Sequence, residues 1–186
     1  MSKAVIFFAP GLEECEGLIT VDLLRRAGVE VQICAVSDSK MITGAHGIRI
    51  ECDALCENAD RDADAVILPG GIPGTPNLAA SETVCGMVRA FYDSGKLVAA
   101  ICAAPTVLGG LGLLEGRRAT CYPGCEGDLG GADYTDAEVI RDGNIITGSA
   151  LGAAIPFALE IIAYLEGPDV AEMKRGSIVY RHGSDL

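Results

Sequence analysis

Cys102 is the residue in this sequence best placed to act as a nucleophile. It follows the apolar segment 97–101 and precedes Ala103, Ala104 and Pro105. Small neighbours permit a tight strand-to-helix turn, and proline suits the first turn of a helix because its missing N–H would be unpaired there. Such a turn points the thiol at helix N–H groups, which favour the thiolate and lower the pKa of a cysteine. The stretch therefore predicts a nucleophile, against the alternative of a buried cysteine that ends a strand.

A glycine-rich loop, residues 68–74 with the sequence LPGGIPG, offers backbone donors. Paired glycines let a backbone approach a ligand closely. The N–H groups near Gly70 to Ile72, together with that of Ala103, would bind a developing oxyanion. The alternative is an ordinary turn, and the chain contains no phosphate-binding motif of the G-x-x-x-x-G-K-[ST] type.

Three acids, Glu13, Glu14 and Glu16, crowd the loop after the first apolar segment. A solvated acidic turn is the simplest interpretation. A carboxylate that pointed toward Cys102 would raise the pKa of the thiol, unless it were protonated and donated a hydrogen bond to the sulfur. A proton shared between the two groups would remove the conflict.

Short β-rich segments alternate with helical patterns, which is typical of a parallel sheet covered on both faces. We expect strands at residues 4–9, 29–36, 65–68, 97–101, 119–121 and 144–147. Ligands gather outside the carboxyl ends of such strands. The loops that follow the first, third and fourth strands carry the acids, the glycines and Cys102, so we expect them to meet at one edge.

Helices and hairpins complete the predicted order. Apolar spacing predicts a helix from about residue 17 to 27, a second helix capped by Ser81, and a well-buried helix over residues 150–166. Two hairpin-like insertions cover residues 41–50 and 138–146.

Composition narrows the class of protein. The 186 residues suit one domain, and a net charge of −12 disfavours nucleic acid and anionic membrane surfaces as partners. We find neither a signal peptide nor an apolar segment long enough for a membrane helix, and we therefore expect a cytoplasmic protein.

The eight cysteines do not predict a metal centre. Cys52 and Cys56, like Cys121 and Cys125, lack the usual spacing of zinc ligands, and the chain has two histidines, His46 and His182. We expect no metal and no cofactor.

Three segments, APGLEECEG, AVILPGGIPGTPNL and VAAICAAPTVL, together resemble the ThiJ/PfpI family of the class I glutamine amidotransferase-like superfamily. The resemblance covers nearly the whole chain. It implies a single domain over residues 1–186, a flavodoxin-like three-layer α/β sandwich with a mostly parallel sheet, and a homodimer.

The resemblance also implies roles for individual residues. Cys102 matches the reactive cysteine and Glu16 its protonated carboxyl partner, while Gly70, Gly71 and Ala103 match the oxyanion-type amides. Arg26 falls where relatives have an arginine near the entrance of the site.

Two positions depart from the family pattern. Some relatives have a histidine where this chain has Ala103, and others have one where it has Tyr122. The chain therefore lacks the histidine that would act as the base in protease or amidase chemistry of the Cys-His kind. A tyrosine is a poor base near neutral pH, so we assign Tyr122 to substrate binding.

Two functions compete, and the resemblance implies the first of them. The first is a cofactor-independent glyoxalase or deglycase that acts on methylglyoxal or its early glycation adducts. The second is an oxidative-stress sensor or redox-regulated chaperone in which Cys102 is oxidised to sulfinic acid. A role in thiamine biosynthesis follows only from the family label. A kinase of that pathway would need a phosphate-binding loop, and we find none in this sequence. The expected small-molecule partner is an electrophilic carbonyl compound or an oxidant.

Overall fold

The computed structural model describes residues 1–181, and His182 lies outside the described part. Its centre is a seven-stranded sheet in the order β10-β11-β7-β6-β1-β2-β5. All neighbouring strands are parallel except β10, which is antiparallel to β11. The strands are β1 Lys3–Phe8, β2 Glu30–Ala35, β5 Ala54–Leu55, β6 Ala65–Leu68, β7 Leu97–Ile101, β10 Val139–Asp142 and β11 Ile145–Gly148.

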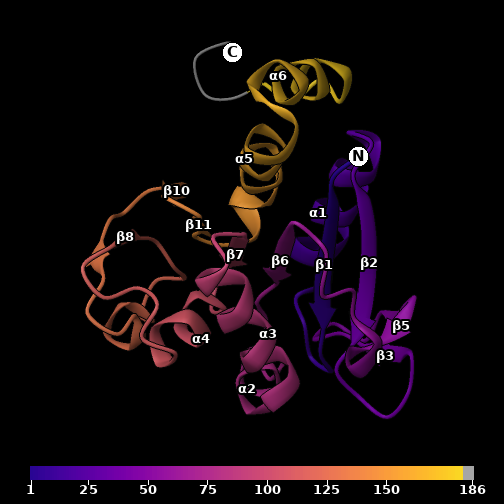
Figure 1. Cartoon of the computed structure of the whole chain (residues 1–186), viewed down its shortest axis with the longest axis vertical. Coiled ribbons are helices and arrows are strands. Elements are labelled where there is room, and N and C mark those ends of the chain that lie inside the picture. Colours follow the sequence, from indigo (N-terminus) through magenta and orange to yellow (C-terminus); the bar gives the residue numbers. More distant parts are fainter. Residues whose placement is uncertain (182–186) are drawn as a thin grey trace.

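Both faces of the sheet are buried, as β1 illustrates. Ala4, Ile6 and Phe8 pack in one apolar cluster, while Val5 and Phe7 pack in another. Alternate side chains of a strand point to opposite faces, so a strand that is apolar at every position needs cover on both sides. Figure 1 shows α5 on one side of the sheet and α2, α3 and α4 on the other. The expected three-layer sandwich is therefore confirmed.

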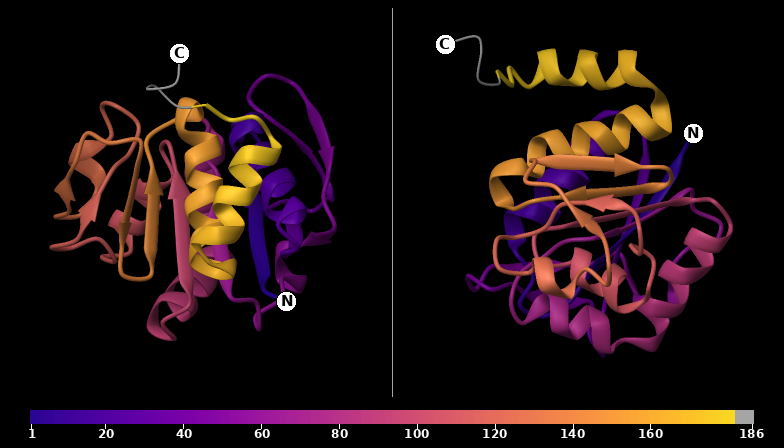
Figure 2. Two further views of the ribbon diagram at one scale, coloured as in Figure 1. Left: turned by 90° about the horizontal axis from the view of Figure 1, so that it is seen from above. Right: turned by 90° about the vertical axis from the view of Figure 1, so that its left-hand side faces the viewer.

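Helices of different lengths supply these layers. They are α1 Glu14–Arg26, α2 Gly74–Ala80, α3 Glu82–Asp93, α4 Pro105–Gly110, α5 Ala154–Glu166 and α6 Pro168–Ser177. Short 3-10 turns cover Cys56–Asn58, Glu126–Asp128 and Leu151–Ala153. The predicted cap is present, because the Ser81 hydroxyl accepts a hydrogen bond from the Val84 N–H at 3.3 Å. Figure 2 shows α6 stacked outside α5, away from the sheet.

The structure differs from expectation in three segments. The strand expected at residues 119–121 is β8, Arg118–Ala119, which pairs with β9, Asp133–Tyr134, in a separate two-stranded sheet. Helix α2 begins inside the segment that we took to be a loop, and a further helix, α6, begins at Pro168, beyond the last helix that we predicted. Pro168 ends α5 and begins α6, since proline fits a first helical turn.

Both expected hairpins are present. β3 Met41–Thr43 pairs with β4 Arg49–Glu51, and β10 pairs with β11. Among the described residues, no helix is long and apolar enough to cross a membrane.

Candidate active site

Three loops meet where the adjacent strands β1, β6 and β7 end. The Glu13 N–H donates to the Gly70 carbonyl at 2.9 Å, and the Gly74 N–H donates to the Gly11 carbonyl at 3.0 Å. These bonds join the first acidic loop to the glycine-rich loop. Cys102 follows β7 directly, so the carboxyl edge gathers the residues that the sequence singled out.

Cys102 occupies a strained turn. Its φ is 65°, in the left-handed region that a non-glycine residue rarely adopts. The backbone is fixed on both sides of this residue, because its N–H donates to the Gly148 carbonyl at 2.9 Å and its carbonyl accepts from the Tyr122 N–H at 2.8 Å. Buried Ala103 and Ala104 follow it, and Pro105 begins α4. The predicted strand-to-helix elbow is therefore present.

Glu16 lies beside this thiol and is almost completely buried, with 1% of its surface exposed. Its Oε2 accepts a hydrogen bond from the Gly70 N–H at 2.9 Å, whereas the buried Oε1 has no hydrogen-bond partner. Gly70 packs between the two groups: a Cβ added there would lie 2.6 Å from Cys102 Cβ and 2.8 Å from Glu16 Oε2. Only glycine leaves room for the thiol and the carboxyl to face each other.

Burial governs the proton affinity of this pair. It raises the pKa of Glu16 to about 7, even though hydrogen bonding to Cys102 and to the Gly70 amide acts in the opposite direction. It also raises the pKa of Cys102 to about 12, and the charge of Glu16 and its hydrogen bond to the thiol add to the rise. The sequence led us to expect a lowered thiol pKa, which is wrong for a buried thiol beside an ionised carboxylate. Below the pKa of Glu16 both groups therefore hold their protons, and above it the pair shares one proton and one negative charge.

The three predicted backbone donors divide into two roles. The amides of Ala103 and Gly71 hydrogen-bond at Cys102 and lower the pKa of its thiol. The Gly70 amide is instead bound to Glu16, so it positions the carboxyl rather than an oxyanion. An oxyanion formed at Cys102 would therefore have two amide donors nearby, not three.

A hollow of about 430 Å³ opens above Cys102. Tyr122, 49% exposed, and Ile72, 67% exposed, stand at its edge. Cys125 also lines this hollow and brings a second thiol to it, which no pattern in the sequence predicted. Its loop turns back on itself, with a hydrogen bond from the Cys125 N–H to the Tyr122 carbonyl at 3.0 Å. The other lining residues are Gly71, Ala103, Pro123 and Gly124.

Arg26 lies elsewhere. It ends α1, forms an exposed ion pair with Asp22 at 2.6 Å, and lines a different hollow beside Ile155 and Ile178. It is not among the residues that line the Cys102 hollow, because it lies in the last turn of α1 whereas Glu16 lies in the first turn.

The remaining acids belong to another cluster. His46, at the tip of the β3-β4 hairpin, lies 2.9 Å from Glu14 Oε2 and 3.5 Å from Glu13 Oε2. Burial raises the pKa of Glu14, but hydrogen bonds from the His46 side chain and from backbone N–H groups outweigh it, so the pKa lies below its usual value. The hydrogen bond to Glu14 raises the pKa of His46.

These features define a class of site: a cysteine at a strained elbow, faced by a buried carboxyl, at the carboxyl edge of a parallel α/β sheet. The profile of the DJ-1/PfpI family matches residues 2–164, and the chain belongs to this family.

Relatives and solved structures agree with this assignment. Protein dj-1beta of Drosophila melanogaster is 38% identical over 96% of this chain and 98% of its own. The glutathione-independent glyoxalase DJR-1.2 of Caenorhabditis elegans is 36% identical over 90% of each chain. The structure of oxidised DJ-1 from Toxoplasma gondii superposes with a TM-score of 0.94, at 30% identity, over 98% of this chain and all of that one.

Proposed function

We propose that this protein is a cofactor-independent glyoxalase of the deglycase type, in which Cys102 attacks the aldehyde carbon of methylglyoxal or of an early glycation adduct. One observation carries the proposal: a cysteine at a strained elbow faces a buried carboxyl, Glu16, whose pKa is raised to about 7. A group that titrates near the working pH is well suited to take up and return protons. The relative named as a glutathione-independent glyoxalase supports the same chemistry.

The first step transfers the thiol proton to Glu16. The exchange moves one negative charge from oxygen to sulfur and creates no second charge, so burial opposes it far less than it opposes ionisation of the thiol alone. Once Glu16 is protonated, its charge no longer raises the pKa of Cys102. The sulfur then bonds to the aldehyde carbon, the carbonyl electron pair moves to oxygen, and that oxygen receives the proton to give a hemithioacetal.

The second step is an internal redox reaction. Glu16 removes the proton from the former aldehyde carbon while the ketone oxygen takes up a proton, which gives an enediol. A proton is then returned to the former ketone carbon and the hydroxyl of the first carbon loses its proton, which gives a lactoyl thioester. The first carbon is oxidised and the second is reduced by the same two electrons, so no external acceptor is needed. Water then cleaves the thioester, releases lactate and restores the thiol. The N–H groups of Gly71 and Ala103 are placed to stabilise the oxyanions.

The walls of the hollow favour small substrates with an apolar side. Ile72 and Pro123 offer apolar contact, and the Tyr122 hydroxyl is the hydrogen-bonding group that we assign to a substrate carbonyl.

The experiment that tests the proposal measures lactate formed from methylglyoxal without added glutathione or metal. We expect turnover by the wild type and a loss of about 10⁴-fold or more in Cys102→Ser, because a hydroxyl is a far weaker nucleophile than a thiolate. Cys125→Ser is the matched control, since it alters the other thiol of the same hollow and should keep most of the activity. Lactate formation that survives in Cys102→Ser would contradict the assignment.

Oxidation of the same thiol is the second candidate. Peroxide would convert the Cys102 thiol to sulfenic acid and water, and a second peroxide would give sulfinic acid and water. The amides of Gly71 and Ala103 favour this candidate, since they would hydrogen-bond to the new oxygens. Incubation of the wild type with methylglyoxal and with peroxide separates the two, because a dedicated sensor forms sulfinic acid at Cys102 but produces no lactate.

We also propose that the chain forms a homodimer. Leu18 on α1 is 38% exposed, and it lines an apolar hollow of about 510 Å³ together with Ile19 and Leu23 of the same helix. A second copy would cover this surface. Light scattering of the wild type and of Leu18→Lys checks it: the expected result is a dimer that the lysine weakens, and a monomeric wild type would contradict the proposal.

A further inference from the structure

The acidic loop holds a second cluster of functional side chains, next to the Cys102 site but separate from it. Glu13 and Glu14, at the beginning of α1, face His46 on the β3-β4 hairpin. Each offers one ligand atom, and the three atoms lie within 4.8 Å of one another. The side chains differ in exposure, with 1% of the Glu14 side chain, 17% of Glu13 and 66% of His46 in contact with solvent.

We propose that Glu13, Glu14 and His46 form a binding site for a divalent transition metal such as Zn²⁺. The donor set is one imidazole nitrogen and two carboxylate oxygens, which suits zinc and its neighbours in the first transition row. The inference concerns metal binding alone and does not depend on the proposed glyoxalase activity.

The spacing of the donors fits such an ion. His46 Nδ1 lies 2.9 Å from Glu14 Oε2 and 3.5 Å from Glu13 Oε2. Metal bonds of about 2.0–2.2 Å place neighbouring ligand atoms about 2.8–3.6 Å apart in octahedral or tetrahedral geometry. The ion would therefore replace the present hydrogen bond with little movement of the backbone.

The structure holds the carboxylate of Glu14 in place for this role. Glu14 Oε1 accepts hydrogen bonds from the His46 N–H at 2.8 Å and the Ile48 N–H at 3.3 Å. Its Oε2 is left to face Nδ1 and Glu13. Bonds of this kind to the second oxygen of a ligating carboxylate are typical of metal sites, because they fix the direction of the first.

The two segments that carry the ligands are also joined to each other. The Gly11 N–H donates to the Thr43 carbonyl at 2.9 Å, and the Ala45 N–H donates to the Leu12 carbonyl at 2.9 Å. The hairpin tip is therefore fixed to the acidic loop by main-chain bonds that do not depend on the His46 side chain.

Charge and access favour a cation. Within the described residues, the ion pairs of Glu13 and Glu14 are those with His46, and neither acid pairs with a lysine or an arginine. With a neutral imidazole the cluster carries two negative charges, one of them buried, which a divalent ion would neutralise. The exposed side of His46 leaves room for water to complete the coordination shell.

A cobalt titration of the metal-free, full-length protein near neutral pH tests the site, with Zn²⁺ as competitor. Nitrogen and oxygen ligands give weak visible bands, whereas thiolate ligands add an intense near-ultraviolet band, so the spectrum separates this cluster from the cysteines. We expect one Co²⁺ per chain, visible bands without the near-ultraviolet band, and displacement by Zn²⁺. In His46→Gln the affinity should fall about 100-fold or more, since loss of a ligand exceeds the effect of losing its support.

His46→Arg is the matched control for a purely structural ion pair. Arginine keeps a cation opposite both acids but has no lone pair for a metal. We expect it to unfold at the wild-type temperature, to bind no Co²⁺ and to gain no thermal stability from Zn²⁺, whereas Zn²⁺ raises the unfolding temperature of the wild type. Wild type that shows no visible bands, or bands that persist in His46→Arg, would overturn the proposal, as would a near-ultraviolet band at the first equivalent.

Discussion

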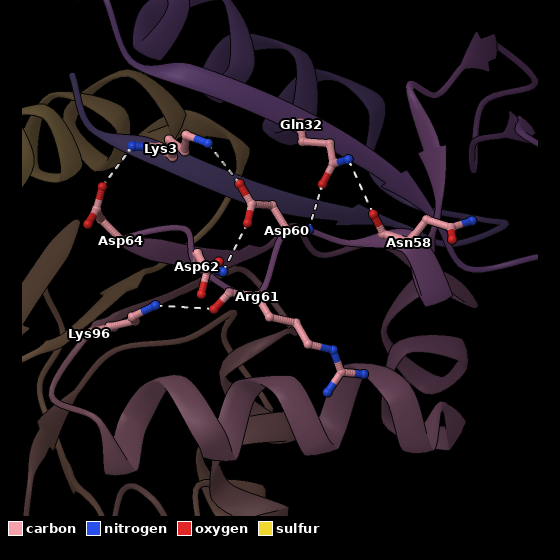
Figure 3. Close-up of polar contacts among 8 residues, drawn as sticks. All are labelled: Lys3, Gln32, Asn58, Asp60, Arg61, Asp62, Asp64 and Lys96. Atoms are coloured by element: carbon pink, nitrogen blue, oxygen red, sulfur yellow. Dashed lines mark hydrogen bonds and ion pairs between the residues drawn. The ribbon is translucent and has the colours of Figure 1, made fainter.

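The polar groups at the amino ends of the adjacent strands β1, β6 and β7 differ from those at the carboxyl ends in how well they are paired. At the amino ends, Lys3 donates through its backbone to Asp64 at 2.9 Å and through its ammonium to Asp60 at 3.2 Å. Figure 3 shows how the network continues from Asp60 to the Asp62 N–H and to Gln32. At the carboxyl ends, a buried oxygen of Glu16 has no partner and Cys102 sits in a left-handed conformation.

The difference shows where this fold tolerates an unpaired buried polar group and a strained backbone, both of which lower stability. Buried polar groups are normally paired, and strained backbone is rare outside functional sites. The amino edge follows both rules: its polar groups are paired by hydrogen bonds and by one partly exposed ion pair, Lys3–Asp60, which costs little. The carboxyl edge breaks both rules within one pair of residues, which is the arrangement expected when an unsatisfied group must remain free to exchange a proton. Substitutions at the carboxyl edge should therefore change activity, whereas substitutions at the amino edge should change only stability.

Glu16→Gln should produce the largest functional change of this series. The amide keeps the shape of the carboxyl but cannot shuttle a proton, so kcat for methylglyoxal should fall by about 10²–10⁴-fold. The measurement is lactate formation under saturating substrate. Asp22→Asn, on the exposed face of the same helix, is the control and should keep wild-type kcat. Equal rates for Glu16→Gln and the wild type would show that the carboxyl edge does not depend on Glu16 for activity.

Gly70→Ala should disturb the same pair through sterics alone. The added methyl group would lie 2.6 Å from Cys102 Cβ and 2.8 Å from Glu16 Oε2, so the thiol and carboxyl must move apart. A misplacement of about 1 Å costs about 10²-fold in rate. Gly86→Ala, where the new Cβ meets nothing within 4 Å, is the matched control. If kcat is unchanged in Gly70→Ala, close approach of the two groups is not needed.

The stability of the protein should depend on pH through Glu16. Its pKa is about 7 in the folded chain against an ordinary value of 4.5, so between these values the folded state keeps a proton that the unfolded state loses. The free energy of unfolding should therefore fall as pH rises through this window, by on the order of 3 kcal/mol. Denaturant unfolding at the two ends of the window measures the change.

Glu16→Gln should remove this part of the pH dependence and unfold at higher denaturant concentration than the wild type above pH 7. An identical pH profile in both proteins would show that burial of Glu16 has no thermodynamic cost.

Asp60→Asn should have the smallest effect. Hydrogen bonds from the Asp62 N–H and from Lys3 lower the pKa of Asp60 below its ordinary value of 3.8, so its contribution is present above that pH and is lost as pH falls further. Near neutral pH we expect a slight decrease in unfolding temperature and unchanged lactate formation. A loss of activity in Asp60→Asn would show that the two edges are coupled.

The sequence was sufficient for the fold where pattern and chemistry coincide. Short apolar segments predicted β1, β2, β6, β7 and β11, and the second hairpin predicted β10, whereas the two-residue strand β5 was not predicted. Ala103, Ala104 and Pro105 predicted the elbow. Helix α2 could not be predicted because its segment, GTPNLAA, combines glycine and proline with little apolar periodicity. β8 was predicted from its apolar residues, but its pairing with β9 depends on a turn far along the chain.

Most residues of the candidate site could be predicted, but Arg26 does not line it, Cys125 was missed, and the pKa of the thiol was not predicted. Cys102, Glu16 and the glycine loop all meet at one edge, as spacing and resemblance indicated. The sign of the thiol pKa depends on how deeply the sulfur is buried and on the charge opposite it, and neither quantity can be obtained from residue types. The path of the backbone likewise decides that the Gly70 amide binds Glu16 while the Gly71 amide binds Cys102. It also decides that Cys125 lines the hollow.

The main chain at Cys102 has a consequence for protein engineering. The Cys102 N–H and carbonyl form hydrogen bonds with the main chain of Gly148 and Tyr122, so the backbone of the elbow is held without any contribution from the sulfur. The backbone conformation at residue 102 is therefore set by main-chain hydrogen bonds and does not depend on the side chain at this position. Serine or selenocysteine at this place would be presented to the hollow from the same direction, so one scaffold could compare oxygen, sulfur and selenium as nucleophiles with everything else held constant.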